Sequence, residues 1–155
     1  MNMPKTMKAA ILVAQNEDLL LDKVTLPEAL DYGQVLVEVF YSGICGSQIG
    51  EIKGVKGEDK YLPHLLGHEG SGVVKSTGPG VKRFKEKDHV VMHWRPASGI
   101  QSANPQYKLD NKTVNAGSVT TFNEYAVISE NRLTKIPEEY SLESATLYGC
   151  AITTG

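Results

Sequence analysis

The sequence is poor in cysteine, in net charge and in long apolar segments. Its 155 residues include only two cysteines, too few and too far apart for the disulfide framework of a small secreted protein. No segment approaches the roughly 20 apolar residues of a membrane-spanning helix. The net charge of −2 offers no basic surface to nucleic acid or an anionic membrane. Because the residues 1–6 also lack the apolar core of a signal peptide, we expect a cytoplasmic protein that contacts neither nucleic acid nor a membrane.

Glycine, in contrast, is abundant, with 15 residues in a chain long enough for one domain with its own core. Short β-branched and aromatic segments alternate with Gly and Pro turns, a pattern typical of a β-barrel with a few short helices. The predicted strands cover residues 7–13, 19–24, 35–42, 72–76, 88–92, 122–128 and 133–136. Helices are predicted over 47–52 and after Ser141, whose side chain is a suitable N-cap.

One segment, 95–117, has no hydrophobic periodicity and is rich in Asn, Ser, Pro and Lys. We expect it to form a long loop or lobe. A loop of this length inside a compact domain usually has a functional role or is a modified lobe.

The residues best suited to chemistry are Cys45, His68 and Cys150, each beside at least one glycine. Taken alone, a cysteine is more often a small buried hydrophobic residue and a histidine a surface or hydrogen-bonded residue. Glycines, however, permit the sharp turns through which such side chains converge. Two thiolates and one imidazole, with a fourth position open, make a catalytic zinc site. Spacing alone leaves open whether the three residues meet.

Five motifs occur in the order found in one known family. The segment 67–72, GHEGSG, resembles the zinc signature of the medium-chain alcohol dehydrogenases. The segment 42–47, SGICGS, resembles the segment of that family's first ligand, and 149–155, GCAITTG, that of its third. The segments 87–91 and 121–125 also fall in family order. The resemblance covers nearly the whole chain and implies a mainly β fold, the GroES-like twisted β-barrel, over 1–155.

This resemblance implies that Cys45, His68 and Cys150 bind one catalytic zinc. Zinc acidifies an alcohol as it acidifies bound water, and in the reverse direction it polarises a carbonyl. The implied activity is transfer of hydride between a small alcohol, with its aldehyde or ketone, and NAD or NADP.

Three further residues match positions of known role in the family. Ser47 matches the hydroxyl that passes the alcohol proton outward, although it could equally be a helix N-cap. Glu69 matches an acid beside the zinc; the alternative is a surface carboxylate. Trp94 matches a position that lines the substrate pocket, and the alternative for a lone tryptophan is a place in the core.

The chain departs from the family pattern in three respects. Gln48 stands where the family usually has Asp, and the loss of a carboxylate that orients the histidine predicts weaker zinc affinity. The segment 95–117 contains no cysteine, so we expect no structural zinc. The glycine-rich dinucleotide fingerprint is absent, and 141–155 leads toward a missing Rossmann domain.

We therefore expect this piece alone to hold zinc but to bind cofactor poorly and to turn over negligibly. Homo-oligomers are expected only with the missing domain. Two alternatives remain open at this point. One is a zinc-free relative of the quinone-reductase kind, which the complete ligand set disfavours. The other is a non-catalytic GroES-like module that binds a protein or a small ligand.

Overall fold

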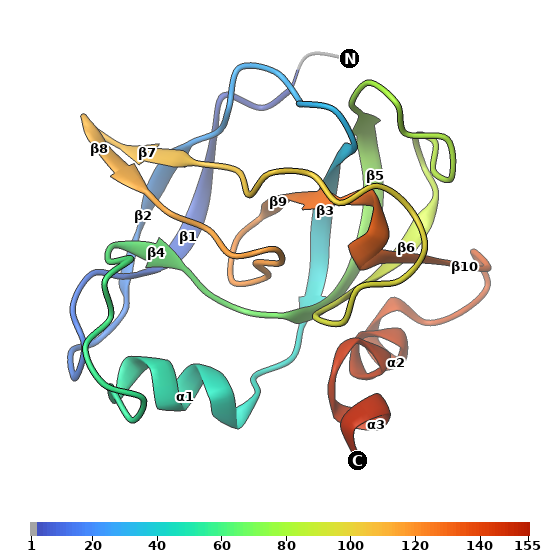
Figure 1. Cartoon of the computed structure of the whole chain (residues 1–155). Coiled ribbons are helices and arrows are strands. Elements are labelled where there is room, and N and C mark those ends of the chain that lie inside the picture. Colours follow the sequence, from blue (N-terminus) through green and yellow to red (C-terminus); the bar gives the residue numbers. More distant parts are fainter. Residues whose placement is uncertain (1–2) are drawn as a thin grey trace.

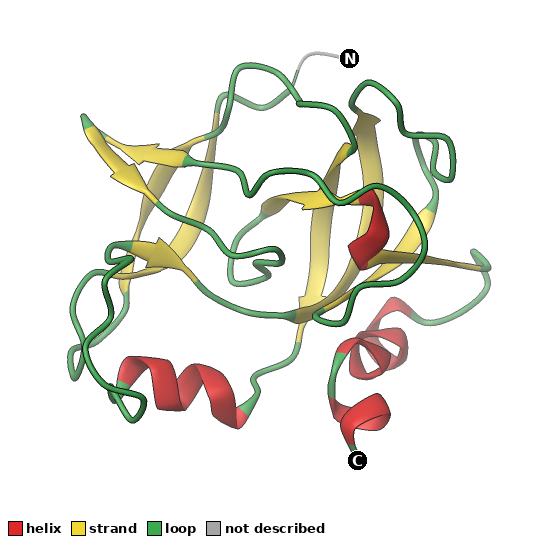
Figure 2. Cartoon of the chain, viewed as in Figure 1, coloured by secondary structure: helices red, strands yellow, loops and turns green. Residues whose placement is uncertain are grey.

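The computed structural model, which describes residues 3–155, consists of two antiparallel five-stranded sheets with short helices at one end (Figures 1 and 2). The first sheet has the order β4 (His64–Leu65), β1 (Thr6–Leu12), β2 (Leu20–Thr25), β7 (Tyr107–Leu109) and β8 (Lys112–Val114). The second has the order β10 (Leu133–Ile136), β6 (His89–His93), β5 (Glu69–Thr77), β3 (Gln34–Ser42) and β9 (Tyr125–Ser129).

The helices are all short. They are α1 (Gly46–Ile52), α2 (Leu142–Thr146) and α3 (Ala151–Thr154), with 3₁₀ turns η1 (Glu130–Arg132) and η2 (Leu147–Gly149). Both α1 and the α2–α3 segment lie below the sheets in Figure 1, at the end where β3 finishes. None of these helices has the length and apolar character needed to cross a bilayer.

Strand β3 divides the interior into two cores because successive side chains of a strand point to opposite faces. Leu36 of β3 and Val127 of β9 belong to the core beneath the first sheet. Val35 and Val37 belong to the second core, which includes residues from all five strands of the second sheet. The other buried members of the first core are Met7, Ala9, Ile11, Val24, Leu26, Leu65, Tyr107 and Val114. Those of the second are Val74, Phe84, Val90, Met92, Val119, Ala126, Ile128 and Leu133.

The predicted fold class, mainly β with a few short helices, is confirmed. Each of the seven predicted strands overlaps an observed one, and Ser141 caps α2 by accepting a hydrogen bond from the backbone N–H of Ser144. Strand β4 was not predicted. Within the segment 95–117, predicted as a long loop or lobe, β7 and β8 form a hairpin that the sequence pattern did not indicate. Three-residue strands are too short to show a periodicity. The hairpin is anchored instead by Tyr107, which is fully buried and whose hydroxyl accepts a hydrogen bond from the Val127 N–H at 3.1 Å.

A buried carboxylate, that of Glu130, is one of the groups that hold the first half of that segment. Its Oε1 accepts hydrogen bonds from the backbone N–H groups of Lys82 and Arg83, both at 3.0 Å. Its Oε2 accepts from the N–H of Ile100 at 2.9 Å. Burial alone would raise the pKa of Glu130, but these three donors and the charge of Arg83 outweigh it and lower the pKa below its usual range. Glu130 thus joins the loop between β5 and β6 to the segment before β7, and neither of these is paired in a β-sheet.

Replacing this carboxylate should destabilise the fold. Glu130→Gln keeps the shape but removes the charge and turns an NH₂ group toward backbone donors, which should cost about 1–3 kcal/mol of unfolding free energy. Urea denaturation measures this as a lower midpoint with an unchanged m-value. Glu138→Gln, at an exposed position, is the matched control and should leave the midpoint unchanged.

The same variant should show the pH dependence of this interaction. The native pKa of Glu130 lies below its unfolded value of roughly 4.3, so its stabilisation is complete above that value and is lost as the pH falls through the native pKa. The stability difference between wild type and Glu130→Gln should therefore be constant from pH 7 to 5 and shrink below pH ~4. A difference that grows in acid would contradict this account.

Candidate metal centre

Three residues from separate parts of the chain converge beneath the second sheet. One ligand atom from each of Cys45, His68 and Cys150 lies within 4.8 Å of the others. Cys45 is the N-cap of α1, His68 is the residue before β5, and Cys150 lies between η2 and α3. The structure thus brings together all three predicted ligands.

The pairing of β3 with β5 accounts for two of these positions. Ser42 at the end of β3 lies opposite Gly70 near the start of β5, so the chain leaves β3 toward Cys45 beside the point where it enters β5 from His68. Gly67 makes the turn into His68 with a φ of 94°, in the left-handed region that favours glycine.

The third position depends on how α2 is attached to β5. The hydroxyl of Ser71 in β5 donates to the carbonyl of Leu142 at 2.5 Å and lies 2.8 Å from the hydroxyl of Thr146. Both contacts fix α2 against the strand that follows His68. The chain then passes through η2 and delivers Cys150 to the cluster.

The ring of His68 is oriented by two neighbours on α1. Its Nδ1 lies 2.7 Å from Nε2 of Gln48 and 3.4 Å from Oγ of Ser47. Its Nε2 is buried and has no hydrogen-bond partner among residues 3–155. Burial lowers the pKa of His68 and so favours the neutral imidazole, the form that binds a metal.

The two thiols are free and lie 3.9 Å apart. The backbone N–H and hydroxyl of Ser47 lower the pKa of Cys45, whereas burial raises the pKa of Cys150. Cys150 also has a contact that the sequence analysis missed: its Sγ lies 3.6 Å from Oγ1 of Thr154. Thr154 follows Cys150 by four positions, one helical turn, which is the signal that could have revealed it.

Glu69 connects the segments that carry the three residues. It is buried, its Oε2 accepts a hydrogen bond from the Ala151 N–H at 2.9 Å, and its backbone carbonyl accepts one from the Gly43 N–H at 3.1 Å. A Cβ at Gly43 or at Gly149 would collide with Glu69. The alternative of a surface carboxylate is therefore wrong, and Gly43 and Gly149 leave room for Glu69.

The structure excludes the alternative roles of Ser47 as a helix N-cap and of Trp94 as a core residue. Ser47 is in the first turn of α1 and is not the N-cap, which is Cys45. Trp94 is 44% exposed, so it is not a core residue, and the guanidinium of Arg95 lies 5.7 Å from its ring centre. The structure leaves the predicted roles of Ser47 in proton transfer and of Trp94 in a substrate pocket as predictions.

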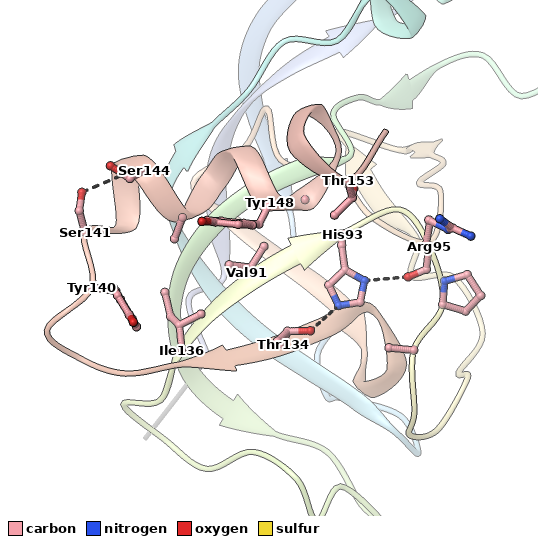
Figure 3. Close-up of a pocket in the computed structure, with 14 residues that line it drawn as sticks. Val91, His93, Arg95, Thr134, Ile136, Tyr140, Ser141, Ser144, Tyr148 and Thr153 are labelled. Atoms are coloured by element: carbon pink, nitrogen blue, oxygen red, sulfur yellow. Dashed lines mark hydrogen bonds between the residues drawn. The ribbon is translucent and has the colours of Figure 1, made fainter. Parts of the chain in front are cut away.

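Two hollows lie near the cluster. The larger, of about 770 Å³, is a mostly apolar groove between β6, β10 and the α2 region (Figure 3). His93 and Arg95 line it, whereas Trp94 between them does not, as expected from the alternation of side chains along an extended chain. The other, of about 570 Å³, is lined in part by Gln48 and His68 and so reaches the cluster itself.

Comparison with known proteins identifies the family. Residues 31–138 match the family described as the alcohol dehydrogenase GroES-like domain. The chain belongs to this family. The GroES-like fold implied by the resemblance is thereby confirmed.

Proteins similar to this GroES-like chain include alcohol dehydrogenase class-3 of Drosophila melanogaster, 29% identical over 97% of this chain and 46% of the relative. The S-(hydroxymethyl)glutathione dehydrogenase of Candida maltosa is 26% identical over 98% of this chain and 46% of the relative. The chain thus spans about half the length of these relatives.

Solved structures give the same result. An alcohol dehydrogenase zinc-binding domain protein from Burkholderia ambifaria superimposes with a TM-score of 0.85 at 25% identity, over 96% of this chain and 46% of that one. Benzyl alcohol dehydrogenase from Acinetobacter calcoaceticus gives a TM-score of 0.80 at 26% identity, over 98% and 47%.

Removing the Glu69 carboxylate should loosen the cluster. Glu69→Ala leaves the Ala151 N–H without its acceptor and opens a gap beside Gly43, so we expect zinc affinity to fall about 10- to 100-fold. Glu69→Gln retains an oxygen for the Ala151 N–H and should lose far less. Titration against a competing chelator measures both variants. Equal affinity of Glu69→Ala and wild type would show that this side chain does not position the cluster.

Proposed function

We propose that Cys45, His68 and Cys150 bind one zinc ion and that this domain is the catalytic half of a zinc-dependent alcohol dehydrogenase. The complete enzyme would transfer hydride between a small alcohol and NAD or NADP. The observation that carries the proposal is the convergence of two thiols and one imidazole within 4.8 Å. The unpartnered, buried Nε2 of His68 supports it, because buried polar groups ordinarily have a partner.

The donor set suits a catalytic zinc better than a structural one. Structural zinc sites in proteins close the tetrahedron with four protein ligands, whereas catalytic sites provide three and leave one position open. Two thiolates balance the charge of the ion. When bound, zinc supplies Lewis-acid polarisation of an alcohol or carbonyl oxygen.

The surrounding residues have separate proposed roles. Ser47 borders the cluster through its contact with His68 and is the hydroxyl proposed to receive the alcohol proton. Glu69 positions the ligand segments from within the fold. Trp94, exposed beside the end of β6, is proposed as one wall of the substrate pocket.

We further propose that the site carries one zinc and that no structural zinc exists. Segment 95–106 has no cysteine, and its hydrogen bonds to Ser129 and Glu130 hold it in place. The cofactor would bind in the half of the enzyme that this chain does not include. The relatives' names support primary alcohols, such as benzyl alcohol, as first test substrates.

The alternatives make different predictions about the metal. A zinc-free relative of the quinone-reductase kind has no use for a converged Cys–His–Cys set, and the geometry therefore disfavours it. A non-catalytic binding module has no need of two thiols and one imidazole brought within 4.8 Å of one another.

Metal analysis tests the proposal. Purified wild-type chain should contain about one zinc per molecule, and Cys150→Ser should lose most of it. His93→Ala, which changes a histidine outside the cluster, should retain the metal. In a longer chain that includes the nucleotide-binding half, Cys150→Ser should also abolish alcohol-dependent reduction of NAD(P). Wild-type chain that stays free of zinc under loading conditions would refute the proposed site.

A further inference from the structure

The side chain of Gln48 has three hydrogen-bond partners and is shielded from water. Gln48 is 2% exposed. One of the partners is the hydroxyl of Ser47, to which Nε2 of Gln48 donates at 3.2 Å. The Oε1 of Gln48 accepts a hydrogen bond from the backbone N–H of Cys45 at 3.1 Å, which caps the start of α1. Its Nε2 lies 2.7 Å from Nδ1 of His68.

These contacts determine which nitrogen of His68 carries the proton. A backbone N–H can only donate, so the Gln48 atom that faces Cys45 must be the oxygen. The atom that faces His68 is then the NH₂ group, which can only donate, and Nδ1 of the neutral ring must accept. The proton of the neutral ring therefore resides on Nε2, the buried atom without a partner.

Metal binding requires the opposite tautomer. A zinc ion takes the lone pair of Nε2, so Nδ1 must carry the proton and donate it. The protonated Nδ1 would then face the NH₂ group of Gln48, and two donors would meet with no acceptor between them. The hydroxyl of Ser47, 3.4 Å from Nδ1, is at the outer limit of a hydrogen bond and is not a substitute.

The amide can remove this conflict only by turning over. Rotation by about 180° brings Oε1 to His68 but places the NH₂ group against the Cys45 N–H. The hydrogen bond that caps α1 at Cys45, itself a ligand residue, is then lost. An amide has one acceptor atom for two donors, whereas a carboxylate of the same length has two.

Resting on the proposed zinc site, we propose that Gln48 is a positioning residue whose amide couples the tautomer of His68 to the cap of α1. Loading the site turns the amide over and exchanges the Cys45 hydrogen bond for one to His68. The metal-free state is therefore favoured relative to a chain with a carboxylate at this position. Gln48 thus lowers the zinc affinity of the site through its hydrogen bonds, in addition to the effect of lacking the negative charge of a carboxylate.

Gln48→Glu tests this inference because it keeps the length and accepts from both donors. We expect its zinc affinity, measured against a competing chelator, to exceed that of wild type about 10- to 100-fold. Ile49→Glu is the matched control, because it adds the same charge to the same helix at a position 47% exposed. It should change the affinity less than 3-fold.

Nitrogen-15 NMR of the histidine rings supplies a second readout that needs no metal. In the metal-free wild type, His68 should show a protonated Nε2 and an unprotonated Nδ1, and in Gln48→Glu the proton should move to Nδ1. A His68→Gln sample assigns the signals. The inference is overturned if metal-free wild type already carries the proton on Nδ1, or if Gln48→Glu binds zinc no more tightly than Ile49→Glu. If neither wild type nor any variant binds zinc, the proposed function fails. The position of the His68 proton in the metal-free chain then still tests whether Gln48 sets the tautomer.

Discussion

The antiparallel pairing of β3 with β5 is the interaction on which the candidate metal centre depends. Because Ser42 lies opposite Gly70, the residues that follow β3 and those that precede β5 meet at one end of the sheet. Cys45 and His68 are consequently close although a helix and a long loop separate them in sequence. The hydroxyl of Ser71 in β5 then binds the carbonyl of Leu142 at the start of α2. This contact positions α2 so that Cys150, which follows it, lies beside Cys45 and His68.

Two buried glutamates carry out comparable tasks at different places in the fold. Glu69 joins the backbone of the first ligand segment to that of the third. Glu130 joins the loop between β5 and β6 to the segment that precedes β7. Each carboxylate accepts hydrogen bonds from backbone N–H groups that are not paired in a β-sheet.

Much of this arrangement could be predicted from the sequence, and the exceptions have physical causes. The long apolar strands follow local patterns, so β3 and β6 were predictable within a few residues. The hairpin of β7 and β8 was not, because it is short and is stabilised by the burial of Tyr107 against a distant strand. Residue types and neighbouring glycines indicated the three candidate ligands.

The geometry around those ligands required the structure. Nothing in the order of residues reveals that Glu69 bonds to the Ala151 N–H or that Gln48 faces both Cys45 and His68. These are contacts between side chains and distant backbone, determined by how the sheet and helices are packed. The exposure of Trp94 was likewise a property of the fold, since the residue type alone favoured burial.

X-ray absorption at the zinc edge of the loaded chain directly tests whether Cys45, His68 and Cys150 bind zinc. The account predicts a first shell of two sulfur atoms at about 2.3 Å and one imidazole nitrogen at about 2.0–2.1 Å, completed by one exchangeable oxygen or nitrogen ligand from solvent. That result would establish a site of two cysteines and one histidine with an open position. A shell of oxygen and nitrogen alone would show that the two cysteines do not bind zinc and would contradict the account.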